Sequence, residues 1–307
     1  MSKSSDQHYT VEKIGEGVYA AIARPDGRGI CNSGFVDLGG SGLVFDTSLT
    51  AASARDLRSQ ANESLGRAPS LAVNSHWHLD HSLGNSMFSN VPIWGTRRTR
   101  EIILERRDEL LSELTREKLE VGVRELEGRR AETRSPGAFA DLEFNLRIYR
   151  ALLDAVDELN LAPPDHTFET QTSLPGNRGA ELLSFGAGHT EADAVLHLRR
   201  EKILFAGDLV VVGIQPSMGS GNPEGWLSGL DQIERLGAER IVPGHGPVTD
   251  VEGIRETRGY VSGVLSAAQS TTGARPPPSI RRWEGSVSLE ENLKFTRGWV
   301  AALRPPK

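Results

Sequence analysis

The most constraining feature of the sequence is a cluster of metal-binding side chains: His76, His78, Asp80 and His81 fall within six residues. In an extended chain, residues i and i+2 point the same way, so His76 and His78 can bind one ion together. If a helix begins directly afterwards, Asp80 and His81 turn toward a second position a few ångströms away. With only eight histidines in 307 residues, chance clustering is a poor explanation. We interpret the cluster as a metal-binding element rather than a polar loop.

Three more metal-binding side chains each follow a strand-like run and a glycine. They are His189 after Gly188, Asp208 after Gly207, and His245 after Gly244. Glycine lets a backbone pass close to an ion or adopt a positive φ. The cluster at 76–81 itself follows the apolar run 71–73. We therefore expect four strand ends to converge on one rim and to gather seven ligands: His76, His78, Asp80, His81, His189, Asp208 and His245.

The remaining pattern is that of an α/β enzyme, in which short apolar runs alternate with helical segments. Strands are predicted at 17–24, 30–37, 42–45, 71–73, 181–185, 194–198, 203–206 and 240–243. Helices are predicted at 50–65, 223–237, 252–271 and 289–303. The prolines at 276–278 indicate a rigid linker.

Residues 97–165 differ from the rest, because they are rich in Arg and Glu and lack strand patterns. Apolar residues at steps of three and four predict helices over 97–127 and 139–159, with a break at 135–137. Such a segment is either a helical hairpin that packs on the main body or a lid over the metal site, and it is a candidate interface.

Composition excludes several classes of partner. The net charge of −6 argues against nucleic acid, whose phosphates favour a basic surface. No apolar run reaches the roughly 18 residues that a membrane span requires. The N-terminus lacks the apolar core of a secretory signal, and the single cysteine, Cys31, suits a reducing compartment. We therefore expect a cytoplasmic protein with a small-molecule substrate, and we interpret Cys31 as a core residue remote from the metal site.

The ligand types favour particular metals. Imidazole and carboxylate without thiolate suit Zn²⁺, and also Fe²⁺ or Mn²⁺. Three histidines (His76, His78, His189) would hold one ion, a second group (Asp80, His81, His245) would hold another, and Asp208 could bridge them. Two such ions per chain can share a hydroxide and stabilise an oxyanion. Asp80 could also act as the general base or return the proton to the leaving group.

The sequence resembles the metallo-β-lactamase superfamily. The resemblance rests on the His-x-His-x-Asp-His run, which is followed by a lone His, a lone Asp and a last His. The resemblance covers about residues 15–250. It implies a four-layer αβ/βα sandwich with a dinuclear site at the edge of its two sheets. It also implies one domain over 1–307 with a helical insertion at 97–165. Asp46 matches the acid of the family's first motif, which orients a metal ligand from behind.

The resemblance also narrows the function. One β-lactamase subclass has a cysteine ligand where this chain has Asp208, and another has serine there. Asp208 therefore indicates the broader hydrolase branch, which includes glyoxalase-II-like thioesterases and lactonases. The expected reaction is attack of a metal-bridged hydroxide on an ester, thioester, lactone or lactam carbonyl, and β-lactam turnover stays open. The alternative is a mononuclear iron persulfide dioxygenase on the same fold, using His76, His78 and Asp208.

Two further side chains near these motifs are expected to be structural. His197 lies in the middle of a predicted strand, and Trp77 between two ligands should pack rather than catalyse. The segment 211–225 follows Asp208 and is either a substrate-contacting loop or a plain connection.

Overall fold

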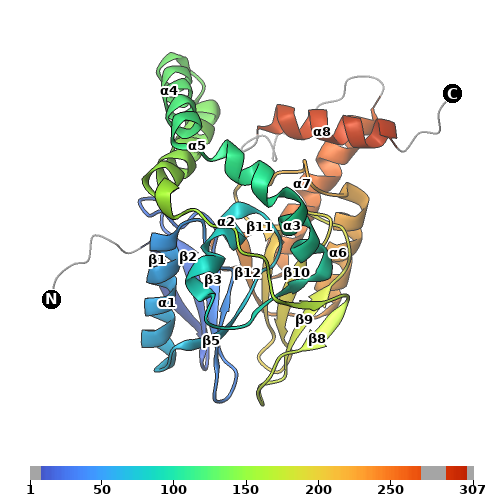
Figure 1. Cartoon of the computed structure of the whole chain (residues 1–307). Coiled ribbons are helices and arrows are strands. Elements are labelled where there is room, and N and C mark those ends of the chain that lie inside the picture. The colour runs from blue at the N-terminus through green and yellow to red at the C-terminus, as the bar shows by residue number, and fades with distance from the viewer. Residues whose placement is uncertain (1–7, 271–287, 303–307) are drawn as a thin grey trace.

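Two β-sheets lie face to face in the computed structural model, which describes residues 8–270 and 288–302 (Figure 1). The first sheet contains, in spatial order, β1 (Tyr9–Gly15), β2 (Val18–Ala23), β3 (Ser33–Asp37), β4 (Gly42–Phe45), β5 (Pro69–Val73), β6 (Ile93–Thr96) and β7 (His166–Phe168). The second contains β12 (Arg240–His245), β11 (Ile203–Val211), β10 (Ala194–Leu198), β9 (Ala180–Ser184) and β8 (Gln171–Ser173).

The main core fills the space between the sheets. Val36, Phe45 and Leu71 of the first sheet are buried together with Leu196 and Phe205 of the second. The rings of Phe45 and Phe205 lie 5.7 Å apart, centroid to centroid. Side chains of alternate strand residues point to opposite faces, so each sheet has a second apolar face to cover.

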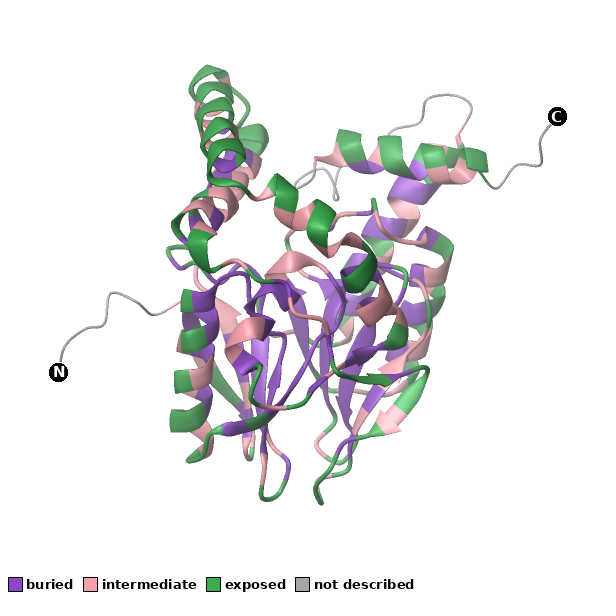
Figure 2. Cartoon of the chain, viewed as in Figure 1, coloured by how far each residue is buried: buried purple, intermediate pink, exposed green. Residues whose placement is uncertain are grey.

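Helices cover both outer faces and complete four layers (Figure 2). The helix α1 (Ala51–Leu65) buries Leu57 against the first sheet. On the other side, α6 (Pro223–Arg235) and α7 (Val251–Gln269) pack on the second sheet, where Trp226 and Tyr260 are fully buried. The expected αβ/βα sandwich is therefore confirmed.

The insertion forms three helices between β6 and β7, namely α3 (Arg97–Glu113), α4 (Arg116–Glu132) and α5 (Pro136–Asp154). The prediction of one helix over 97–127 is wrong. The chain breaks at Leu114–Thr115, and the Thr115 side chain accepts a hydrogen bond from the backbone of Lys118 to begin α4. A threonine at this position is a standard helix start. The tip of the α4–α5 hairpin projects away from the sheets in Figure 2 and is largely exposed.

Four strands escaped the sequence analysis: β1, β6, β7 and β8. Of these, β7 and β8 have three residues each, which is too short for an alternating pattern to show. β1 has only two buried residues. The other predicted elements are present within a few residues, including the last helix, α8 (Leu289–Ala302). The predicted linker at 276–278 lies outside the described residues.

None of the helices within the described ranges has both the length and the apolarity needed to cross a membrane.

Candidate metal centre

The cluster at 76–81 begins where β5 ends. The chain leaves Val73, passes through a short loop, and starts the one-turn helix α2 (Leu79–Ser82) directly after His78. The side-chain amide of Asn74 stabilises this turn by donating through Nδ2 to the backbone carbonyl of His81 at 3.0 Å. His76 and His78 therefore project from the loop, and Asp80 and His81 project from the helix, as the sequence predicts.

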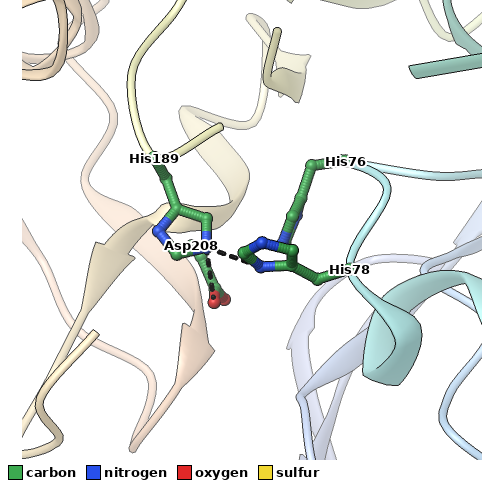
Figure 3. A group of neighbouring side chains, drawn as sticks. All are labelled: His76, His78, His189 and Asp208. Atoms are coloured by element: carbon green, nitrogen blue, oxygen red, sulfur yellow. Dashed lines mark hydrogen bonds and ion pairs between the residues drawn. The ribbon is translucent and has the colours of Figure 1, made fainter. Parts of the chain in front are cut away.

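One group of possible ligands consists of His76, His78, His189 and Asp208 (Figure 3). Each offers one ligand atom, and these atoms all lie within 4.8 Å of one another. The Nε2 atom of His189 lies 3.0 Å from Nδ1 of His78 and 3.4 Å from Oδ2 of Asp208. His189 comes from the loop after β9, so this group joins the two sheets.

A second group consists of His81, Asp208 and His245. The Nε2 atom of His81 lies 3.2 Å from Oδ1 of Asp208, and Nε2 of His245 lies 3.5 Å from Oδ2. Asp80 borders this group, with its Oδ2 atom 3.3 Å from Nε2 of His245. All seven predicted ligands thus meet at one place, and Asp208 belongs to both groups.

Asp208 does not end its strand, which corrects one prediction. β11 continues to Val211, and the register with β12 shifts between Phe205 and Gly207. Gly207 has φ +51°, and a Cβ atom there would lie 2.5 Å from Cβ of Ser75. A Cβ atom on Gly244 would lie 1.9 Å from Oδ1 of Asp208. The two glycines let the backbone bulge and press Asp208 into the site.

Asp46 lies behind the site and orients His81. Its buried carboxylate accepts from the Ser75 amide at 2.7 Å, from the Ser75 hydroxyl at 2.8 Å and from Nδ1 of His81 at 2.8 Å. Its φ of 61° lies in the left-handed region. Because Nδ1 of His81 donates to Asp46, Nε2 faces the centre. The backbone carbonyl of Ile30 orients His245 in the same way. It accepts from Nδ1 of His245 at 3.2 Å, so Nε2 of that ring faces the centre.

Three buried polar atoms in the centre have no hydrogen-bond partner among the described residues: His76 Nε2, His81 Nε2 and Asp208 Oδ1. Buried polar atoms are rarely left in this state, because each costs about 1–3 kcal/mol. A divalent ion coordinates the nitrogen and oxygen atoms that hydrogen bonding does not reach. The donor set of imidazoles and carboxylates therefore fits metal binding.

The pKa values separate the histidines into two kinds. Burial lowers the pKa of His189 to about 3 and that of His76 well below its usual value. Burial also acts on His245, but the carboxylates of Asp208 and Asp80 raise its pKa to about 9. Metal ligation requires neutral imidazole, so an ion bound there would displace a proton from His245. The carboxylates thus supply negative charge that a cation would balance.

Cys31 is a core residue, as the sequence predicts, but it lies beside the centre. The prediction that it is remote from the metal site is therefore wrong. The residue is fully buried, and its thiol donates to the backbone carbonyl of Asp80 at 2.8 Å. Its sulfur falls in a third possible group with Asp80 and His81. Burial raises the pKa of Cys31 to about 12, so the thiol is protonated in the metal-free protein. Nothing in the sequence indicates this contact, because it joins residues 49 positions apart.

The site opens into a cavity of about 140 Å³. The cavity is lined by ligand residues, by Phe144, Ile148 and Leu152 of α5, and by Gln215 and Ser217 of the segment that follows β11. The insertion therefore walls the site as well as packing on the body, and segment 211–225 contributes to the lining. Trp77 is buried and donates to Glu191 at 2.9 Å. His197 is buried in β10 and belongs to none of the groups of possible metal ligands among the described residues.

The comparisons with known proteins agree with this geometry. The profile of the metallo-beta-lactamase superfamily matches residues 26–245, which is more than half of the chain. The chain belongs to the metallo-beta-lactamase superfamily. Most members of this superfamily are metal-dependent hydrolases that bind divalent metals, commonly zinc. The comparison with curated proteins found no match.

Solved structures of the superfamily share the fold at low sequence identity. The DIM-1 metallo-beta-lactamase is 18% identical, with a TM-score of 0.58 over 83% of this chain and 97% of that one. A metallo-beta-lactamase from Pontibacter korlensis is 19% identical, with a TM-score of 0.57 over 83% and 99%. FIM-1 from Pseudomonas aeruginosa, in its mono-zinc form, is 16% identical, with a TM-score of 0.57 over 84% and 96%. At these identities the likeness shows the superfamily fold alone.

Proposed function

We propose that the protein is a hydrolase with two zinc ions per chain that cleaves an ester, thioester, lactone or lactam. The observation that carries the proposal is the position of Asp208. A single buried carboxylate lies within ligand distance of two separate groups of histidines. A mononuclear centre does not need the second group.

The residues divide the work between them. His76, His78 and His189 would hold one ion and His81, His245 and Asp80 the other, while Asp208 belongs to both groups of side chains. Bound ions of this kind lower the pKa of water and polarise a carbonyl oxygen.

Asp80 is the proposed proton carrier. Burial alone would raise its pKa, but His81 and His245 lower it to about 2, so the group is ionised at neutral pH. Its side chain is 23% exposed and lines the 140 Å³ cavity. A carboxylate there can accept the proton of the attacking water and pass it to the departing oxygen, sulfur or nitrogen.

The test replaces Asp208 with Asn, which keeps the shape of the side chain between the two glycines. We expect the D208N variant to fold, to bind fewer zinc ions and to lose hydrolysis of a panel of ester, thioester, lactone and β-lactam substrates. Elemental analysis and initial rates measure both effects. Asp108→Asn, at a side chain that is 94% exposed, is the matched control. Full activity of D208N with two zinc ions retained would contradict the proposal.

The same measurements address the alternative function. His76, His78 and Asp208 also form the two-histidine, one-carboxylate set of a mononuclear iron oxygenase. One iron per chain together with oxygen uptake on a persulfide substrate would favour that enzyme over the hydrolase.

A further inference from the structure

A large cleft adjoins the metal centre under the insertion. It has a volume of about 790 Å³ and lies between the 22–32 segment, α5 and the residues after β11. The cleft and the 140 Å³ cavity share four lining residues: Ile30, Phe144, Ile214 and His245. The two spaces therefore adjoin each other at a predicted ligand, His245.

Most charged side chains that line the cleft are neutralised within the protein. The ion pairs are Arg24–Asp26, Arg28–Asp154, Arg130–Glu143 and Arg150–Glu127. Each of these cleft residues has an oppositely charged partner, so none of them leaves an unbalanced charge for a ligand.

Arg147 of α5 is different. Its guanidinium donates through Nη1 to the backbone carbonyls of Pro25 at 3.0 Å and Arg24 at 3.5 Å. Its Nε atom is buried and has no hydrogen-bond partner in the part of the chain that the structure describes. Among the described residues no carboxylate lies within 4.0 Å of the guanidinium. Arginine stays charged even when buried, so the cleft wall carries one uncompensated positive charge.

The guanidinium has a defined relation to the metal centre. It lies 5.0 Å from the ring centroid of Phe144, and that ring lies 6.4 Å from the ring of His245. The charge and the predicted ligand thus both neighbour one aromatic ring. Ile30 and Ile214 make the surrounding wall apolar.

We propose that the substrate is a small organic monoanion whose carboxylate binds Arg147 while an apolar spacer lies along Phe144 toward the scissile bond. One unbalanced cation matches one carboxylate, whereas a phosphate monoester carries close to two charges and calls for a second cation. The insertion thereby sets the substrate class. This inference rests on the proposed hydrolase function.

The experiment compares two esters on the zinc-loaded protein. The 4-nitrophenyl monoester of glutaric acid carries a carboxylate, and 4-nitrophenyl pentanoate is its neutral counterpart of equal chain length. In both, water adds to the acyl carbon, the acyl–oxygen bond breaks, and 4-nitrophenolate leaves. We expect Arg147→Met to lower kcat/KM for the glutarate ester about ten- to a hundredfold, through loss of a charged hydrogen bond. The pentanoate value should change less than about threefold.

The controls separate charge from packing. Arg147→Lys should recover part of the loss because it restores the charge without the planar fork. Arg124→Met, on the exposed side of α4, should match the wild type. An equal loss on both esters, or no loss on either, would overturn the inference.

A binding measurement keeps the inference distinct from the hydrolase proposal. Monomethyl glutarate is a monoanion, and its binding to wild type and R147M can be followed by saturation-transfer NMR. Binding to wild type alone, without turnover of either ester, would support the anion site and contradict the hydrolase. Turnover of both esters at equal rates, without binding of monomethyl glutarate, would support the hydrolase and contradict the anion site.

Discussion

Single residues behind the ligands decide how the ligands point. The Asp46 carboxylate is hydrogen-bonded to Ser75 and His81, and it fixes which nitrogen of His81 faces the centre. The sequence was sufficient to name the seven candidate ligands, because each lies near the end of a strand-like run or beside a glycine, and the family resemblance added Asp46. It could not reveal the contact of Cys31 with Asp80, because a thiol within an apolar run shows nothing of its distant neighbours.

At this scale we predict that Asp46→Asn weakens metal binding while leaving the fold. Asparagine tolerates the positive φ of this position but lacks the negative charge that holds His81. Affinity for one zinc ion should fall about 10–100-fold, as measured by competition with a chromogenic chelator. The control is Asp157→Asn, whose side chain is 86% exposed. Unchanged affinities for both ions would show that Asp46 plays no part in holding the ligand.

Elements show where local patterns stop being informative. The spacing of apolar residues predicts α5. The helix boundary before Thr115 cannot be predicted in this way, because apolar and charged residues continue across it without a change of pattern. β11 was predicted to stop at Gly207, and it continues because the bulge there preserves pairing with β12 to Val211. Glycine marks the place of a backbone irregularity without telling whether a strand ends or bends.

The α4–α5 hairpin has a small core of its own, consisting of Leu126, Leu142 and Leu146. We predict that Leu146→Ala, at a fully buried side chain, destabilises the hairpin by about 2–5 kcal/mol. Hydrogen exchange should accelerate in α4 and α5 while amides of β11 keep their protection. Leu104→Ala, at a 49% exposed side chain of α3, is the control. Equal acceleration in β11 would show that the hairpin and the sandwich unfold together.

At the scale of the whole molecule, the candidate ligands come from both sheets. His76, His78 and His81 follow a strand of the first sheet, whereas Asp208 and His245 belong to the second. The sequence predicted this convergence from the resemblance and from the repeated strand-glycine pattern. It left open whether residues 97–165 cover the site, since an amphipathic stripe records burial and not the identity of what is covered.

We therefore predict that a chelator lowers the thermal stability of the protein. A metal that binds only the folded state adds about 2.7 kcal/mol when its free concentration is a hundred times its Kd. Calorimetry with and without the chelator should show a lower Tm without metal, restored by added zinc. In D208N the chelator should shift Tm less. Identical melting of the wild type in both conditions would show that no metal stabilises the fold.

The spread of the ligands along the chain also bears on how the protein is made. His81 precedes His245 by 164 residues (245 − 81). Ribosomes add about 5–20 residues per second, so roughly 8–33 s separate the synthesis of the two. During that interval the nascent chain exposes three histidines and an aspartate without the strands that complete the centre. We expect metal acquisition to follow translation of β12, which makes the loaded centre a marker that both sheets have been synthesised.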